Sequence, residues 1–312
     1  MTIALLSALI RPLIEPRLPG WVEPRWFATH EEALAAAAQA EIGWFDMYDK
    51  DAMAATVVAA EKLKWLNSIY AGLDFMPLDL MAQRGVTVTN GVGINAVTIA
   101  EYTVMLMLTH AKGYRKVVQA MDRHEWLLDS PGKRELAGER VLLLGLGAIG
   151  SLIRTRLEAF DMEVVPVRRS GAGGALRPDE WRGQLETFDW VVIAVPSTPE
   201  TVGMIGAAEL AAMKPNAVLV NIARGDVVDQ AALIEALAEK RIEGALLDVT
   251  DPEPLPPEHP LWDLENAQIT MHLSGRAQDK MFQRSADRFL ANLDRYRAGE
   301  PLEPVMDLAL GY

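Results

Sequence analysis

The stretch VLLLGLGAIG, Val141–Gly150, decides the fold. Its leading apolar residues predict a buried strand, and Gly145, Gly147 and Gly150 follow in the pattern G-x-G-x-x-G. In such a turn the first glycine permits a tight bend, the second lets a phosphate approach the backbone, and the third lets the next helix pack against the strand. The stretch therefore predicts a site for the pyrophosphate of a dinucleotide.

The residues after the turn support this interpretation. A helix is expected over Ile149–Ala159, so the backbone amides near its start, those of Ala148 and Ile149, are free to face a pyrophosphate. The later strands are near-continuous apolar runs, as in a parallel sheet covered on both faces. We expect strands at Glu163–Val167, Trp190–Val195, Ala217–Ile222, Gly244–Val249 and Ile269–His272, with helices at Ala207–Met213, Gln230–Glu239 and Asp279–Ala298. This alternation is typical of a doubly wound, Rossmann-like α/β sheet.

The first hundred residues predict a second, smaller parallel sheet without a phosphate loop. Short strands, beginning with Ile3–Ile10, alternate with short helices. The segment Asn95–Ala120 has the pattern of one long apolar helix, buried under a domain or in a dimer contact.

Composition excludes several classes of protein. A chain of 312 residues is long enough for two domains, and its net charge of -13 argues against a nucleic-acid surface. The absence of cysteine excludes disulfides, thiolate catalysis and cysteine-ligated metals, and we expect no metal site. The opening run MTIALLSALI is too short to span a bilayer and has no basic start like that of a signal peptide. We therefore expect a cytoplasmic protein that contacts neither nucleic acid nor a membrane.

The end of the strand Glu163–Val167 bears on the choice of cofactor. A site for NAD places Asp or Glu about 20 residues after the glycine turn, where the carboxylate accepts from the ribose 2′-hydroxyl. Here the strand is followed by Arg168, Arg169 and Ser170. A guanidinium can hold a 2′-phosphate through two hydrogen bonds, so NADP is the expected cofactor. NAD is the alternative if the arginines are solvated loop charges.

Several longer motifs, taken in order, resemble the D-isomer-specific 2-hydroxyacid dehydrogenases. NGVGINAVTIAEYTVMLML (Asn90–Leu108) is similar to the family's inter-domain segment, and RELAGERVLLLGLGAIG (Arg134–Gly150) is similar to its cofactor turn. PSTPETVGMIGAAELAAMKPNAVLVNIARGDVVD (Pro196–Asp229) matches the longest signature of the family. DVTDPEPLPPEHPLW (Asp248–Trp262) and ITMHLSG (Ile269–Gly275) resemble the segments that carry the remaining catalytic positions.

The resemblance implies three catalytic residues. Arg224 matches the arginine that holds the substrate carboxylate and polarises the oxo group. His272 matches the histidine that gives a proton to the carbonyl oxygen as hydride arrives, and Glu253 matches the acid that pairs with it. These residue types suit the chemistry, because arginine is permanently charged and forked and histidine exchanges protons near neutral pH. Each follows a predicted strand, at the sheet edge where α/β sites lie.

The resemblance also implies binding roles. Tyr70, Ala71 and Gly72 correspond to a loop whose backbone amides face the substrate carboxylate. The other implied cofactor contacts are Pro196, Thr201, Ala223, Asp248 and Gly275, with Asp248 near the nicotinamide amide. Three positions depart from the family pattern. Met271 stands where proline usually precedes the histidine, Lys112 stands where many members have arginine, and Tyr70 is bulky for the carboxylate loop.

The family architecture implies a substrate domain of residues 1–100 plus 285–312, a dinucleotide-binding domain of residues 101–284 inserted in it, and a homodimer. The function expected is reduction of 2-oxo acids to D-2-hydroxy acids with a preference for NADPH. The substrate would resemble glyoxylate or hydroxypyruvate, or would be bulkier, since Trp44, Phe45, Tyr70 and Met271 are large. Two alternatives stay open: a phosphoglycerate dehydrogenase-like enzyme that uses NAD, and a dinucleotide-sensing binding protein without catalysis.

Overall fold

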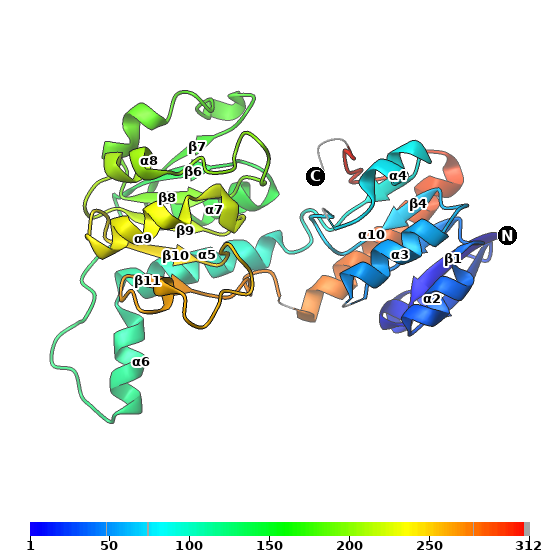
Figure 1. Ribbon diagram of the computed structural model, residues 1–312, viewed down its shortest axis with the longest axis horizontal. Coiled ribbons are helices and arrows are strands. Elements are labelled where there is room, and N and C mark those ends of the chain that lie inside the picture. The colour runs from blue at the N-terminus through cyan, green and yellow to red at the C-terminus, as the bar shows by residue number, and fades with distance from the viewer. Residues whose placement is uncertain (48, 74, 277, 309–312) are drawn as a thin grey trace. The chain divides into compact units, whose positions relative to one another are not determined.

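The computed structural model describes residues 1–47, 49–73, 75–276 and 278–308. The chain forms two compact units, unit 1 (Met1–Asn95 and Ala277–Tyr312) and unit 2 (Ala96–Arg276). Unit 2 is therefore inserted in unit 1, as predicted (Figure 1). The observed crossings, after residues 95 and 276, lie five and eight residues before the boundaries expected from the sequence.

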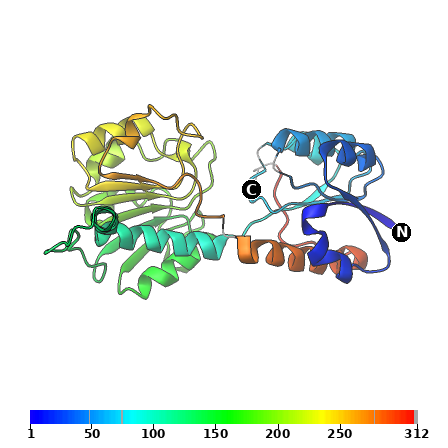
Figure 2. The same cartoon turned by 90° about the horizontal axis from the view of Figure 1, so that it is seen from below.

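Unit 2 contains a six-stranded parallel sheet in the order β11-β10-β9-β8-β6-β7. Its strands are β6 (Arg140–Leu144), β7 (Glu163–Val167), β8 (Trp190–Ile193), β9 (Val218–Asn221), β10 (Gly244–Leu247) and β11 (Ala267–Ile269). One face packs on α5 (Ala96–Ala111) and α7 (Ala148–Glu158), and the other on α8 (Ala207–Ala212) and α9 (Gln230–Ala238). Figure 2 shows helices on both faces, so this is the doubly wound sheet that the sequence predicts.

Unit 1 contains a five-stranded parallel sheet in the order β2-β1-β3-β4-β5. Its strands are β1 (Thr2–Ser7), β2 (Val22–Phe27), β3 (Ile42–Trp44), β4 (Trp65–Asn67) and β5 (Thr87–Thr89). One face packs on α2 (His30–Ala37), α3 (Lys50–Ala59) and α4 (Leu78–Gln83), and the other on α1 (Arg11–Ile14) and α10 (Gln278–Ala298). Phe289 of α10 packs on Trp44 and Trp65 with ring centroids 5.0 Å apart in each pair, so the last helix completes the core of the first sheet.

One predicted helix and one predicted strand need correction. The helix expected over Asn95–Ala120 is two helices, α5 and α6 (Tyr114–Asp122), because Gly113 between them has a φ of 59°. The strand expected over Ile269–His272 ends at Ile269, because Met271 and His272 have φ of 55° and 56°. Positive φ is incompatible with a strand, so the histidine lies in a turn rather than at a strand end.

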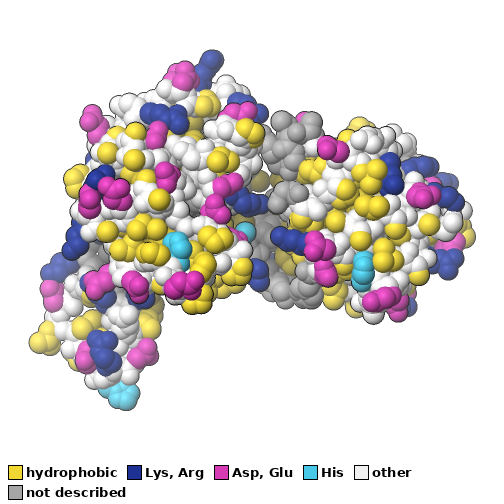
Figure 3. Space-filling model, viewed as in Figure 1, with side chains coloured by type: hydrophobic (Ala, Val, Ile, Leu, Met, Phe, Trp, Pro, Cys, Tyr) yellow, Lys and Arg dark blue, Asp and Glu magenta, His cyan; other side chains and the backbone are white. Residues whose placement is uncertain are grey.

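The segment α6 and the residues after it project from unit 2 (Figures 1 and 3). The base of this projection is closely packed: a Cβ at Gly132 would lie 2.2 Å from the carbonyl carbon of Lys112. Lys112 Nζ also donates to the Arg134 carbonyl at 2.7 Å. The projection is therefore tied down where it leaves the sheet and where it returns.

None of the helices in the described part of the chain is long and apolar enough to cross a membrane. The cytoplasmic location stays a prediction.

Candidate active site

The glycine turn has the geometry that the sequence predicts for a phosphate loop. Gly145 has a φ of 104°, and a Cβ there would lie 2.6 Å from the Ala194 carbonyl oxygen. A Cβ at Gly150 would lie 2.0 Å from the Gly145 carbonyl oxygen, so the helix can approach the strand only without a side chain. Gly147, the N-cap of α7, has open space on its Cβ side. The three positions, with the amides of Ala148 and Ile149 at the helix start, fit a dinucleotide pyrophosphate.

Arg168, Arg169 and Ser170 follow β7 and are all exposed. The Arg168 amide donates to the Leu176 carbonyl, and the Gly171 amide donates back to the Arg168 carbonyl, which shapes a tight turn. Within the described residues the Arg168 guanidinium makes no hydrogen bond or ion pair. Hydrogen bonds from Thr198 and from the Glu200 backbone lower the pKa of the Glu200 carboxyl, and the charge of Arg169 nearby lowers it further. Arg168 is thus the side chain with capacity to bind an anion.

Arg224 is the third residue after β9 and is exposed. The buried Asn221 orders its backbone, because Asn221 Nδ2 donates to the Arg224 carbonyl (2.8 Å) and Asn221 Oδ1 accepts from the Ala223 amide (3.0 Å). A Cβ at Gly225 would lie 2.1 Å from the carbonyl of Thr250. The backbone that follows Arg224 therefore touches the backbone that leads to Glu253, and this contact requires glycine.

Glu253 and His272 form a pair: Glu253 Oε2 lies 2.8 Å from His272 Nδ1. Glu253 Oε1 accepts from the Thr250 amide at 3.1 Å, which fixes the carboxylate. Both side chains are about two-fifths exposed, Glu253 at 38% and His272 at 46%. A carboxylate on Nδ1 selects the tautomer with the proton on that nitrogen, and it leaves Nε2 for proton exchange with a ligand.

Asp248 holds the turn that carries the histidine. Its buried carboxylate accepts from Thr270 Oγ1 (2.7 Å), from the Leu273 amide (3.1 Å) and from both the amide and the hydroxyl of Ser274. The His272 amide donates to the Asp248 carbonyl. Five donors therefore converge on one residue and fix a turn with two consecutive left-handed residues. The predicted contact of Asp248 with a nicotinamide stays a prediction.

The remaining predicted cofactor residues lie along the same edge of unit 2. Thr201 Oγ1 donates to the Pro196 carbonyl at 2.7 Å and accepts from the Thr198 amide at 2.8 Å, so it closes the turn after β8. Ala223 is buried behind Arg224, and Gly275 follows the histidine turn. Their roles toward a cofactor stay predictions.

Tyr70, Ala71 and Gly72 lie in unit 1, after β4. The Gly91 amide donates to the Tyr70 carbonyl (2.7 Å), and Asn90 Nδ2 donates to the Ala71 carbonyl (2.7 Å). The amides of Ala71 and Gly72 have no acceptor within the described residues. The loop thus presents two adjacent backbone donors, the arrangement expected for binding a carboxylate.

The structure therefore brings Arg224, Glu253 and His272 to one edge of unit 2, with the glycine turn on the same sheet. Sequence reasoning missed the supporting residues Asn221, Gly225, Thr270 and Ser274. Gly225 left a signal, since a glycine directly after a candidate catalytic arginine indicates close backbone approach. Asn221, Thr270 and Ser274 could not be singled out from the sequence, because a polar residue near a strand end is common on any surface.

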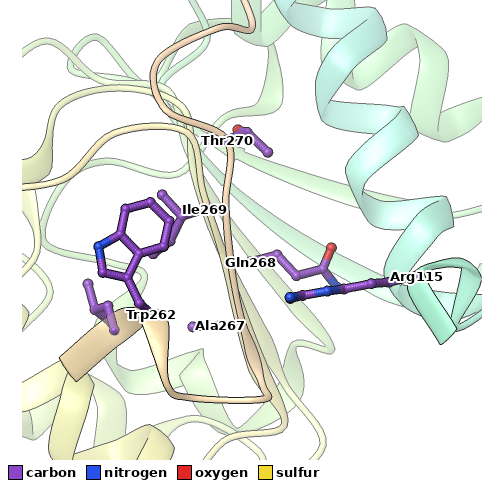
Figure 4. A pocket seen from close by; sticks show the side chains of 7 residues that line it. Arg115, Trp262, Ala267, Gln268, Ile269 and Thr270 are labelled. Atoms are coloured by element: carbon purple, nitrogen blue, oxygen red, sulfur yellow. The ribbon is translucent and has the colours of Figure 1, made fainter. Parts of the chain in front are cut away.

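A cavity of about 220 Å³ lies elsewhere in unit 2, beside the edge strand β11. Figure 4 shows Arg115 extending from α6 toward Gln268, with Trp262 on the other side of the strand. Thr270 also lines it, but the predicted catalytic and cofactor residues do not. The cavity therefore borders the candidate site at Thr270, whose hydroxyl donates to Asp248.

Comparison with known proteins is consistent with this geometry. The protein-family model described as "D-isomer specific 2-hydroxyacid dehydrogenase, NAD binding domain" matches residues 104–274 of this chain. A solved D-isomer specific 2-hydroxyacid dehydrogenase family protein from Aeromonas salmonicida has a TM-score of 0.87 and 28% identity, covering 98% of this chain and 99% of that one. An NADPH-dependent glyoxylate/hydroxypyruvate reductase from Sinorhizobium meliloti, solved with NADP and malonate, has a TM-score of 0.78 and 25% identity, covering 99% and 98%.

Two curated relatives carry named activities. A glyoxylate reductase of Thermofilum pendens is 34% identical over 273 residues, which are 81% of this chain and 80% of that protein. A D-3-phosphoglycerate dehydrogenase of Methanocaldococcus jannaschii is 32% identical over 256 residues, 80% of this chain but 48% of that protein. The chain spans about half the length of the phosphoglycerate dehydrogenases that it matches.

Proposed function

The chain belongs to the family of D-isomer specific 2-hydroxyacid dehydrogenases, and from this membership we propose that it reduces 2-oxo acids to D-2-hydroxy acids with NADPH. The observation that carries the proposal is the pair of His272 and Glu253, 2.8 Å apart, on the same sheet edge as Arg224. Unit 2 is then the dinucleotide-binding domain, and unit 1 is the substrate domain. The glyoxylate reductase and the glyoxylate/hydroxypyruvate reductase among its relatives favour a small 2-oxo acid.

In this mechanism the candidate site residues have different tasks. The Arg224 guanidinium binds the carboxylate of the substrate and draws electron density from its oxo group. His272 gives the proton on Nε2 to the oxo oxygen, while Glu253 holds Nδ1 and stabilises the charged imidazole before transfer. The amides of Ala71 and Gly72, in unit 1, are two further donors suited to a carboxylate. NADPH, when bound, supplies the hydride that reduces the oxo carbon.

The preference for NADPH rests on Arg168. Its guanidinium is exposed, it follows β7, and a carboxylate that would repel a 2′-phosphate is absent from positions 168–170. The complex of the Sinorhizobium meliloti relative with NADP supports this choice. A charge-assisted hydrogen bond contributes about 1.5–3 kcal/mol, which corresponds to roughly a 10- to 150-fold preference.

The proposal is tested by following NADPH and NADH oxidation side by side with glyoxylate, hydroxypyruvate and phenylpyruvate. We expect turnover with NADPH, loss of at least 100-fold in kcat in His272→Ala, and an Arg168→Ala variant whose KM rises for NADPH but not for NADH. Equal rates with both nucleotides would overturn the role of Arg168. No turnover with any 2-oxo acid, together with tight NADPH binding, would favour a dinucleotide-sensing protein.

A phosphoglycerate dehydrogenase-like activity is less favoured by the structure. Its substrate carries a second anion, and the basic residues near the start of unit 1 are Arg11, Arg17 and Arg25. Each of the three is already paired with an acid, respectively Glu15, Asp287 and Glu23. They are therefore poorly suited to bind a phosphate group.

We also propose that the chain forms a homodimer through the projection of unit 2. The projection carries exposed apolar side chains, namely Tyr114, Val118, Met121, Trp126, Leu127 and Leu128. Trp126 is 89% exposed and Leu128 is 97% exposed, although both are large and apolar. Large apolar side chains left exposed in one segment are typical of a protein interface, and a second copy would cover them.

A further inference from the structure

A buried acid lies next to the substrate loop of unit 1. Asp46 follows β3 and is 5% exposed. Its carboxylate accepts three hydrogen bonds of 2.6 Å, from Trp44 Nε1, from Ser68 Oγ and from the Ile69 amide. Two of these donors belong to the segment that leads into the substrate loop, so the acid binds that segment rather than its own element alone.

The hydrogen bonds continue from Asp46 into the loop itself. Ser68 Oγ, which donates to Asp46, accepts from the Tyr70 amide at 3.1 Å. The amides of Ile69 and Tyr70 are thereby occupied, while those of Ala71 and Gly72 have no acceptor in the described part of the chain. The network therefore separates the amides that shape the loop from the two that can bind an anion.

The opposite side of the loop is held by the segment after β5. Asn90 and Gly91 donate to the carbonyls of Ala71 and Tyr70, both at 2.7 Å. A Cβ at Gly91 would lie 1.8 Å from the Ile69 carbonyl oxygen, so the two backbones are in direct contact. The loop is therefore held from two directions. Asn90 and Gly91 bind its carbonyl groups, and Asp46 and Ser68 bind the amides of Ile69 and Tyr70.

The acid is costly for the fold. Burial raises the pKa of Asp46 to about 6, although the three hydrogen bonds act in the opposite direction. All three donors are neutral, so no cation offsets the burial. The ionised carboxylate at neutral pH therefore lowers the stability of this core.

We infer that Asp46 is a positioning residue for substrate binding: through Ser68 and the Ile69 amide it holds loop 69–72 in the conformation that offers the Ala71 and Gly72 amides to a carboxylate. This inference rests on the proposed function of the loop. Asp46 itself touches no substrate in this arrangement.

The kinetic test compares Asp46→Asn and Ser68→Ala with Asp49→Asn. In Asp46→Asn an NH2 group replaces one of the two carboxylate oxygens, so one acceptor becomes a donor. Either Ser68 loses its acceptor, or Trp44 and the Ile69 amide lose theirs. Asp49 is the matched control, because it is an acid three residues away that caps α3 through the Ala52 amide. With glyoxylate and NADPH we expect the KM for glyoxylate to rise about tenfold in both test variants. The kcat and the KM for NADPH should stay within about twofold, and Asp49→Asn should match the wild type.

A second readout does not depend on turnover. Hydrogen–deuterium exchange, followed by mass spectrometry of peptides covering residues 66–73, should be about tenfold faster in both test variants and unchanged in Asp49→Asn. If Asp46→Asn does not fold, Ser68→Ala carries both tests. An unchanged KM or unchanged exchange in the folded variants would overturn the inference. Absence of turnover in the wild type would instead overturn the proposed function, while exchange would still report whether Asp46 holds the loop.

Discussion

The histidine turn shows how one residue's conformation depends on its neighbours. Met271 and His272 both have positive φ, a region that non-glycine residues rarely adopt. Proline, with its φ fixed near −65°, cannot take the conformation of Met271. The departure from the family pattern that the sequence shows at position 271 therefore coincides with a backbone that excludes the usual residue. Asp248 supplies the hydrogen bonds that hold this conformation.

Asp248→Asn should lower kcat by about 100-fold, because an amide nitrogen would face donors on the 270–274 turn and displace His272. Ser274→Ala should lower it by about tenfold, since one donor is lost without creating a clash of donors. Steady-state rates at saturating NADPH and 2-oxo acid measure both effects. A change confined to the KM for NADPH would indicate instead that Asp248 acts on the cofactor.

Asp46 predicts a pH dependence of stability. Its pKa is about 6 in the folded chain against an ordinary 3.8, so between these values the folded state binds more protons. Stability from this group is therefore present below pH 4 and is lost as pH rises through 6, by about 3 kcal/mol. Asp46→Asn lacks this loss, so its melting temperature should rise relative to that of the wild type between pH 4.5 and 7.5. A difference that does not vary with pH would contradict the prediction.

At the scale of elements, the strands of unit 2 were predictable because their apolar runs are short, regular and separated by turn residues. β2 was missed, since Pro24 lies within it and proline removes a backbone donor. β2 tolerates proline because it is an edge strand. The break between α5 and α6 was missed because a single glycine in an apolar pattern does not by itself end a helix.

Some residues of the candidate site could be predicted from the sequence, and others could not. Arg224, Glu253 and His272 each follow a strand within a recognisable motif, so all three could be predicted from the sequence. Asp46 lies in FDMYDK, which has no motif, and its burial and its two contacts with the neighbouring segment, from Ser68 and Ile69, distinguish it from a surface acid. Burial and hydrogen bonding between distant segments are properties of the fold that local sequence does not display.

Gly225→Ala tests the contact between two elements of the site. The new Cβ would meet the backbone of Thr250 and Asp251, so the segment that carries Glu253 must move. We expect a loss of about 1–3 kcal/mol in stability and at least tenfold in kcat. Gly183→Ala is the control, because a Cβ there has open space, and it should behave like the wild type in melting temperature and rate.

At the scale of the whole molecule, the projection of unit 2 predicts assembly. Replacing Trp126 and Leu128 by Glu together should convert a dimer into a monomer, because the charges would have to be buried at the interface. Light scattering coupled to size exclusion measures the mass, and circular dichroism checks the fold. A control is Leu9→Glu, which alters an exposed apolar residue outside the projection. A wild-type chain that is monomeric at micromolar concentration would contradict the proposal.

The insertion of unit 2 has a consequence for synthesis on the ribosome. The sheet of unit 1 is translated early, but the helix that covers Trp44 and Trp65 emerges only after the whole of Ala96–Arg276. At roughly 5–20 residues per second this delay lasts on the order of 10–40 s. During it the nascent chain exposes an aromatic sheet face while unit 2 can already fold. Production in cells should therefore depend on chaperones that shield nascent apolar surface.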